Sequence, residues 1–311
     1  MTNRMVLLAL VSLALVALLA GCGGSNSGSG GLVTPLGYVG KIAFDRTISG
    51  QRDIFIMTAA GSNQVNLTKG VGKHNTVPSF SPNGAQIVFE SDRKSVSDLY
   101  IMQSEGSGVK RLTFDGAVKT SPHWSPDGKL IAYQRLSSSP TQFDLWTIKP
   151  DGTQATNRTK TAAFERGASW GPDSKTLFFN TDLWGLPDLA RLTFGDPQWT
   201  RLTSSGEWNA GPMLSPDGTK LLFASNRSGA WHVYRMGSGG NPATVVQLTT
   251  GGDFNWNAVY VLGGTRIVFE SNRKDNHFQI FSMKNDGTDM RRLTTTATLT
   301  DDRDPAWNNG G

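Results

Sequence analysis

The chain has 311 residues and a formal net charge of +5, from 30 Lys and Arg against 25 Asp and Glu. The basic residues never occur in a run longer than two, so the sequence lacks the clustered basic stripe of a nucleic-acid-binding protein, and we expect no nucleic-acid partner. The 36 Gly and 14 Pro, with 9 Trp and 15 Phe, predict many short strands that are joined by tight turns and packed by aromatic side chains.

The N-terminal segment differs from the rest of the chain. Arg4 precedes an apolar run of 16 residues, from Met5 to Ala20, which is short for a spanning helix and typical of a signal peptide. The run ends in Leu-Ala-Gly-Cys at residues 19–22, which resembles the lipobox of bacterial lipoproteins. We therefore expect residues 1–21 to be a lipoprotein signal peptide and Cys22 to carry the lipid, although an ordinary secretory signal with a chance Cys remains an alternative.

Residues 22–39 are rich in Gly and Ser and predict a flexible tether, whose Gly/Ser-rich stretch would span roughly 20 Å root-mean-square. Cys22 is the only cysteine, so the fold contains no intramolecular disulfide. Gly23 is not the Asp that retains lipoproteins at the inner membrane of enteric-type bacteria. The expected location is the cell envelope, lipid-anchored, and at the outer membrane if the cell has one.

From residue 40 onward the chain repeats itself with a period of 44 to 47 residues. A large residue, Trp in three copies, recurs once per period: Phe80, Trp124, Trp170, Leu214, Tyr260 and Trp307. It is followed by a Ser-Pro-Asp-Gly-like turn, in which Pro presets φ and Gly accepts positive φ. An apolar run such as Ile87-Val88-Phe89 comes next and indicates a strand covered on both faces. This period with four strand-like segments is the signature of propeller blades.

The two ends of the repeat region complement each other. The chain ends on a first strand, residues 304–311, and the repeat region opens at residue 40 on a second strand that has no first. Aligning Trp307 with Phe80 brings Ile42 onto Ile87 without losing a residue. We therefore predict a single domain over residues 40–311, with six blades of four antiparallel strands: 40–68 with 304–311, 76–114, 120–160, 166–204, 210–250 and 256–295.

The repeat resembles the WD40-like (PD40) repeat of the TolB propeller family. The resemblance rests on the Pro-x-Trp-Ser-Pro-Asp-Gly turn, the Ser-Asn/Asp-Arg triplets at 91–93, 225–227 and 271–273, and the later Leu-Thr pairs. It implies an all-β, six-bladed propeller and a location in the cell envelope. TolB carries an additional N-terminal domain where this chain has only the tether, so the resemblance concerns the propeller alone. Because this fold hosts many functions, the resemblance predicts little about activity.

One position of the repeat is polar in all six copies, three residues before the first-strand Pro. We expect these side chains to line the channel mouth as a partner-binding ring, with two arginines one position further along. The candidates are Asn75, Lys119, Glu165, Asn209, Asn255 and Asp302, together with Arg166 and Arg303. For the Asn residues, capping of the loop backbone is an equal alternative.

Catalytic chemistry is not indicated. The four histidines, His74, His123, His232 and His277, occupy different phases of the repeat, so we expect no shared metal site and no cofactor. Residues 167–171 read Gly-x-Ser-x-Gly, but they belong to the first strand of a repeat and not to a strand-to-helix turn, so they do not indicate a hydrolase nucleophile. The leading hypothesis is a monomeric scaffold that binds an envelope protein or peptide. The alternative is a carbohydrate-binding or carbohydrate-active propeller, in which Trp208 and Trp256 could stack on a sugar.

The lipid anchor can be tested directly. Replacing the expected lipidated residue, Cys22→Ser, removes the thiol that would accept the diacylglyceryl group, so the protein is expected to leave the membrane fraction. Fractionation of cells that express each form checks this. A mutant that remains in the membrane fraction unprocessed contradicts the anchor.

Overall fold

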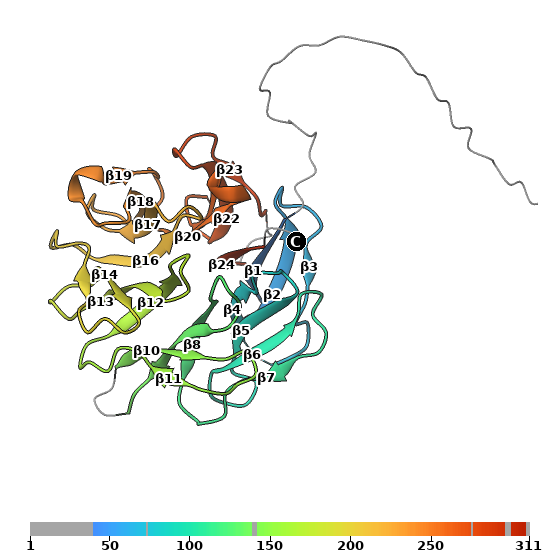
Figure 1. Cartoon of the computed structure of the whole chain (residues 1–311). Helices are drawn as coiled ribbons and strands as arrows, with labels where there is room; N and C mark the ends of the chain where they lie inside the picture. Colours follow the sequence, from blue (N-terminus) through green and yellow to red (C-terminus); the bar gives the residue numbers. More distant parts are fainter. Residues whose placement is uncertain (1–39, 73, 139–141, 275, 296–299, 309–311) are drawn as a thin grey trace, which may run out of the picture. The chain divides into compact units, whose positions relative to one another are not determined.

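The structure is a computed structural model, and it describes residues 40–72, 74–138, 142–274, 276–295 and 300–308. These residues form six four-stranded antiparallel sheets arranged as blades in a ring (Figure 1). The helical elements among them are two 3₁₀ turns, Pro242–Thr244 and Leu262–Gly264. The predicted all-β, six-bladed propeller is therefore confirmed. The expected signal peptide, lipidation site and tether lie outside the described residues.

Each blade runs from a strand beside the channel to a two-residue strand at the rim. The first blade contains β24 (Asp302–Asn308), β1 (Lys41–Ile48), β2 (Gln51–Thr58) and β3 (Val65–Asn66). The second contains β4 (Asn75–Phe80), β5 (Gln86–Ser91), β6 (Asp98–Gln103) and β7 (Lys110–Arg111), and the third β8 (Lys119–Trp124), β9 (Ile131–Leu136), β10 (Phe143–Ile148) and β11 (Thr156–Asn157). The fourth contains β12 (Glu165–Trp170), β13 (Thr176–Thr181), β14 (Asp188–Thr193) and β15 (Thr200–Arg201), the fifth β16 (Asn209–Leu214), β17 (Lys220–Ser225), β18 (His232–Gly237) and β19 (Val246–Gln247), and the sixth β20 (Asn255–Val261), β21 (Arg266–Ser271), β22 (Gln279–Lys284) and β23 (Arg291–Arg292).

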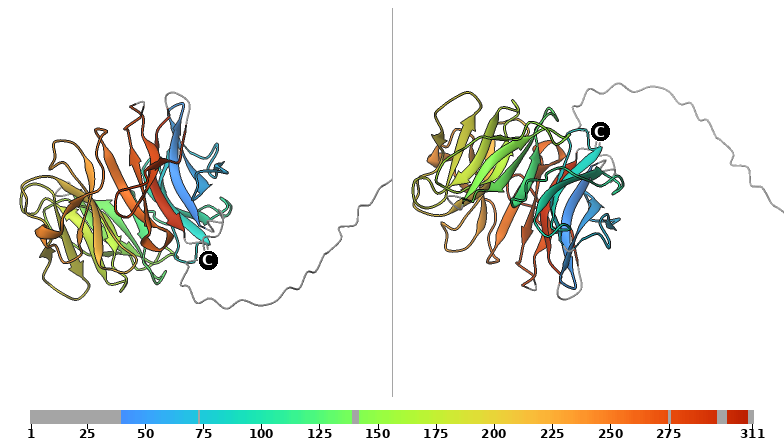
Figure 2. Two further views of the ribbon diagram at one scale, coloured as in Figure 1. Left: turned by 90° about the horizontal axis from the view of Figure 1, so that it is seen from above. Right: turned by 90° about the horizontal axis from the view of Figure 1, so that it is seen from below.

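The C-terminal strand closes the ring. Strand β24 pairs antiparallel with β1, so the two ends of the described chain lie side by side in one sheet (Figure 2). Ile42 pairs with Trp307, and Ile87 pairs with Phe80 in the second blade. The register expected from the repeat alignment is thus confirmed, and no inner strand of the ring is left without a partner.

Apolar side chains of the second strands are buried on both faces. Ile87, Val88 and Phe89 are all fully buried, although successive residues of a strand point to opposite sides. Ile87 and Phe89 pack with Ala43 and Ile54 of the first blade, so one blade covers the next. Contact between blades therefore supplies the two-sided burial that the apolar runs require.

A threonine holds the short outer strand of every blade. Its Oγ1 accepts the backbone N–H of a residue near the start of the third strand, at 2.9–3.1 Å. The six threonines are Thr68, Thr113, Thr159, Thr203, Thr249 and Thr294. This shared contact explains why a Leu-Thr pair ends nearly every repeat, since two ladder residues alone would hold the rim weakly.

Removal of the closing strand tests the architecture. Deleting residues 304–311 takes most of β24 from the first blade and exposes β1, so the whole ring is expected to lose stability because each blade depends on its neighbours. We expect the melting temperature to fall by at least roughly 10 °C. The exposed-site variant Lys129→Ala serves as the control, and an unchanged melting temperature in the deletion would contradict closure by this strand.

Candidate functional site

The six ring residues predicted to line the channel mouth are buried inside the sheets. Each has an exposed fraction of 0%: Asn75, Lys119, Glu165, Asn209, Asn255 and Asp302. A partner cannot touch a side chain that is completely covered, so their assignment as contact residues is corrected. Repeat phase rightly places them at equivalent positions, but it does not say whether the side chain points into the channel or between blades.

The three asparagines brace their own blades. Asn75 Oδ1 accepts hydrogen bonds from Ser91 at 2.9 Å and from Arg93 at 2.8 Å, and the Arg93 guanidinium lies over the ring of Tyr100. The same contacts recur as Asn209 with Arg227, and as Asn255 with Ser271 and Arg273. The Ser-Asn/Asp-Arg triplets are therefore architectural.

Two of the charged members of the set form buried ion pairs. Lys119 Nζ lies 3.0 Å from Asp98 of the preceding blade and also contacts Asp115. Asp302 pairs with Arg46 at 2.6 Å within the first blade. Lys119 and Asp302 therefore stabilise the ring and present no charge to the channel. Glu165 Oε1 accepts a hydrogen bond from Thr161, and this carboxyl group forms no ion pair among the described residues.

The channel wall begins two positions further along each inner strand, at a β-bulge. The register with the second strand shifts at this point in all six blades. The bulge residues have positive φ, between 47° and 63°, and all line the central cavity: Val77, Ser121, Gly167, Gly211, Asn257 and Asp304. Positive φ is costly for residues other than Gly, above all for a β-branched Val, and local backbone strain of this kind is common beside functional sites.

Gly167 shows why the wall is crowded. A Cβ at this position would lie 3.0 Å from Asn180 Oδ1 and 3.4 Å from the backbone of Gly211 in the next blade. The bulges of the fourth and fifth blades therefore approach one another closely.

The central cavity has a volume of about 550 Å³. Trp208, Trp231, Trp256, Phe164 and Arg166 are among its lining residues. A second hollow of about 560 Å³ shares two of these tryptophans with it and adds Phe254, Phe278 and Arg303. Two of the eight predicted contact residues, Arg166 and Arg303, thus reach the cavities. The Arg303 guanidinium lies 3.6 Å from the centre of the Phe278 ring, and Arg166 lies over Phe164.

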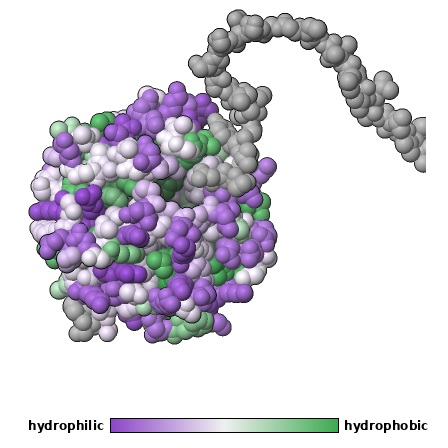
Figure 3. Space-filling view, in the orientation of Figure 1, coloured by the Kyte–Doolittle hydropathy of each residue, from purple (hydrophilic) through white to green (hydrophobic). Residues whose placement is uncertain are grey.

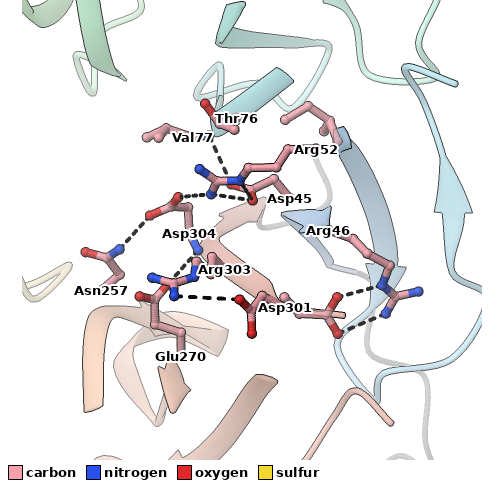
Figure 4. Close-up of polar contacts among 12 residues, drawn as sticks. Asp45, Arg46, Arg52, Thr76, Val77, Asn257, Glu270, Asp301, Arg303 and Asp304 are labelled. Carbon is pink, nitrogen blue, oxygen red and sulfur yellow. Dashed lines mark hydrogen bonds and ion pairs between the residues drawn. The ribbon is translucent and has the colours of Figure 1, made fainter. Parts of the chain in front are cut away.

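A polar network joins three successive blades across the channel wall (Figure 4). Asp304 accepts hydrogen bonds from Asn257 at 2.5 Å and from Arg52 at 3.2 Å, and its own N–H donates to Glu270 at 2.8 Å. Arg52 also binds Asp45 at 2.6 Å. Asn257 and Asp304 hold one position of the repeat, and Asp45 and Glu270 hold another, but the contacts among them form only when the ring closes.

Burial changes the protonation of this network. Burial, and then repulsion from Asp304, raises the pKa of Glu270 to about 8. Burial likewise raises the pKa of Asp45 well above its ordinary value, with Asp304 adding to the effect, and raises the pKa of Glu90. The pKa of His123, in the cavity wall, falls to about 4 because burial disfavours its charged form. At neutral pH Glu270 is therefore largely protonated and can donate a hydrogen bond as well as accept one.

The carboxyl groups of Asp304, Glu270 and Asp45 lie close together in the channel wall. Converging carboxyl groups are typical of an enzyme, but a ligand has little access to these. Glu270 is 3% exposed and Asp45 is fully buried, whereas the Asp304 side chain is 18% exposed. Within the described residues, no group of three or more His, Cys, Asp or Glu side chains could hold a metal ion. The wall therefore offers a ligand one partly exposed carboxylate beside aromatic rings.

Exposed apolar side chains gather on one face of the ring. We call it the mouth face: the loops that join second to third strands within a blade, and those that join one blade to the next. Of the ten large apolar side chains exposed in the described parts of the chain, eight lie in or beside these loops: Ile48, Val71, Phe114, Leu183, Trp184, Leu186, Trp208 and Phe254. Both hollows include residues of the same loops. Figure 3 shows the mixture of apolar and hydrophilic groups on one side of the ring.

The fold and the hollow channel define a six-bladed β-propeller whose centre can receive a ligand. The sequence profile of the TolB beta propeller domain matches residues 38–161 and 169–311, and the chain belongs to this family.

Related proteins support the assignment. A TolB homolog of Chlorobium chlorochromatii is 28% identical over 213 residues, which is 66% of this chain and 45% of the homolog. Dipeptidyl-peptidase 5 of Porphyromonas endodontalis is 35% identical over 119 residues, which is 36% of this chain and 17% of the peptidase. The chain matches less than half the length of these relatives.

Solved structures agree on the fold. TolB from Acinetobacter baumannii superposes with a TM-score of 0.75 at 22% identity, over 88% of this chain and 67% of that one. A putative TolB from Agrobacterium tumefaciens gives 0.64 at 18% identity, over 82% of this chain and 89% of that one. At these identities the similarity establishes architecture and not activity.

The corrected role of the ring residues predicts an effect on stability. Lys119→Glu would replace the buried cation between Asp98 and Asp115 with a third carboxylate, and breaking a buried pair in this way is expected to cost about 3–5 kcal/mol. Arg166→Glu, at an exposed position of the same ring, should change the free energy of unfolding by less than about 1 kcal/mol. Urea denaturation of both variants measures the difference in the free energy of unfolding. Equal small effects would contradict a stabilising role for the buried Lys119 ion pair.

Proposed function

We propose that the protein is a lipid-anchored scaffold of the cell envelope that binds a protein or peptide on its mouth face. The gathering of exposed apolar side chains on this one face carries the proposal. Eight of the ten large apolar side chains exposed in the described residues lie in or beside its loops, and such a gathering favours an interaction surface. Membership of the TolB propeller family supports an envelope role.

The chemistry of the mouth face suits a protein partner. Its exposed set includes Trp184, Trp208, Phe114 and Phe254, and aromatic side chains dominate the energetic centres of protein interfaces. Arg166 and Arg303 lie beside the two hollows and could pair with acidic groups of the partner. The hollow itself gives an inserted segment a desolvated pocket, and such a pocket adds more affinity than contacts on a wet rim.

The anchor would hold the propeller at a bilayer through the lipid on Cys22. Among the residues that the structure describes, no helix is long and apolar enough to cross a membrane. The tether and the lipobox-like sequence support attachment by lipid, and the Cys22→Ser fractionation addresses it separately from binding.

A carbohydrate ligand is the second candidate. Trp231 and Trp256 form an edge-to-face pair with ring centres 4.3 Å apart, and both line the two hollows next to Asp304 and Asn257. Aromatic platforms flanked by carboxylates and amides suit sugar rings. This candidate predicts that soluble oligosaccharides occupy the cavity and compete with any protein partner.

Removing aromatic side chains from the mouth face tests the proposal. The double variant Trp208→Ala with Phe254→Ala should reduce retention of the partner from an envelope extract by at least about tenfold, since each is expected to lie near the interface centre. The measurement is the amount of each co-purified protein, quantified by mass spectrometry against the wild-type chain.

A matched control uses apolar residues of similar exposure on the rim. Val65→Ala with Val246→Ala removes two side chains, 51% and 47% exposed, on the outer strands β3 and β19. The control should retain the partner. Loss of binding in the control, with none in the mouth-face variant, would place the partner on the rim and refute the proposed surface.

A further inference from the structure

A polar residue near the start of each third strand faces the buried first residue of the next blade's inner strand, and we call this contact a junction. One of the six junctions differs from the others in its charge. Asp53 faces Asn75, Asp98 faces Lys119, and His232 faces Asn255. Asp188 is paired with Arg201, and Asp302 at the last junction is paired with Arg46. In each of these five cases a cation or an amide N–H satisfies the acidic or histidine side chain.

The junction between the third and fourth blades has a carboxyl group on each side. Asp144 of β10 is 6% exposed, and Glu165 of β12 is fully buried. Neither forms an ion pair among the described residues. The fourth-strand residue that is Arg111 or Arg201 in the neighbouring blades is Asn157 here, and its amide donates to Asp144 Oδ2.

Three buried oxygens at this junction have no hydrogen-bond donor among the described residues: Asp144 Oδ1, Glu165 Oε2 and Gln142 Oε1. The equivalent Thr113 and Thr203 each donate to one carboxylate of their blade. Here Thr159 has one hydroxyl proton for two carboxyl groups. The junction is therefore short of donors.

The amide of Gln142 has only one reasonable orientation. Its Nε2 donates to the carbonyl oxygen of Thr161 at 2.6 Å, and a flipped amide would place two oxygens against each other. Thr161 in turn donates through Oγ1 to Glu165 Oε1. These contacts hold the amide oxygen of Gln142, which is 4% exposed, in the same buried group as the two carboxyls.

We propose that this junction is a divalent-cation site, with Gln142, Asp144 and Glu165 as oxygen ligands and Ca²⁺ as the ion that fits best. Two buried carboxylates without a cation cost far more than a buried pair can recover, so they require a counter-charge. A Ca²⁺ ion neutralises both and accepts carboxylate and amide oxygens together in irregular geometry. Without the ion, burial and then Asp144 raise the pKa of Glu165 to about 7, so a proton is the competitor.

The test measures Ca²⁺ binding by the full chain in detergent at pH 8, after treatment with chelator. We expect close to one Ca²⁺ per chain by equilibrium dialysis, with a dissociation constant on the order of 10⁻⁴–10⁻³ M. The melting temperature should rise by about 4 °C in 10 mM CaCl₂. Glu165→Gln should weaken binding at least tenfold. Glu165→Lys copies the Lys119 arrangement, so it should be stable in chelator and insensitive to Ca²⁺.

Asp304→Asn is the control, because it alters the channel carboxylates and leaves this junction intact, and it should bind Ca²⁺ as the wild type does. Binding that survives Glu165→Gln but is lost in Asp304→Asn would assign the ion to the channel and overturn the proposal. If the wild type binds no Ca²⁺ at pH 8, or if Glu165→Gln binds it as tightly as the wild type does, no cation site exists at this junction.

Discussion

Every inner strand of this ring begins with a polar side chain that is completely buried, and the rest of the structure depends on how each is satisfied. An unpaired polar group in the interior costs a few kcal/mol, and an unpaired charge costs much more. Asn75 meets this demand with Ser91 and Arg93 of its own blade, whereas Lys119 reaches Asp98 of the preceding blade. These contacts fix where each strand enters the ring, so the blades are held by directional bonds in addition to apolar packing.

The bulges follow from the same constraint. Once the first residue of an inner strand is turned between the blades, a bulge two residues later, as at Val77 and Asp304, brings the chain back to the channel wall. The bulge residues line the cavity together with larger groups such as Trp208 and Arg166. The rigid blades support a mouth face whose composition can vary without changing the ring, which suits a binding scaffold.

The architecture could be predicted because the sequence repeats once per blade. The recurrence of Phe80, Trp124 and their equivalents set the number of blades, and the two incomplete ends set the register of Ile42 with Trp307. The site was less predictable. The position within the repeat identified six equivalent polar residues, but it did not show which way their side chains point. Buried side chains were therefore predicted to form a binding surface. The members of the Asp304 and Arg52 network come from strands far apart in the sequence, and only the closed ring brings them together.

The central claim is that the mouth face, and not the opposite face, receives the partner. Site-specific photo-crosslinking in living cells tests it most directly, with the crosslinking residue placed at Phe114 or Trp208 on the mouth face, or at Asp151 or Asp217 in turns of the opposite face. The account predicts one discrete crosslinked protein from both mouth-face positions and none from the opposite turns. The same crosslinked protein obtained only from Asp151 and Asp217 would contradict it.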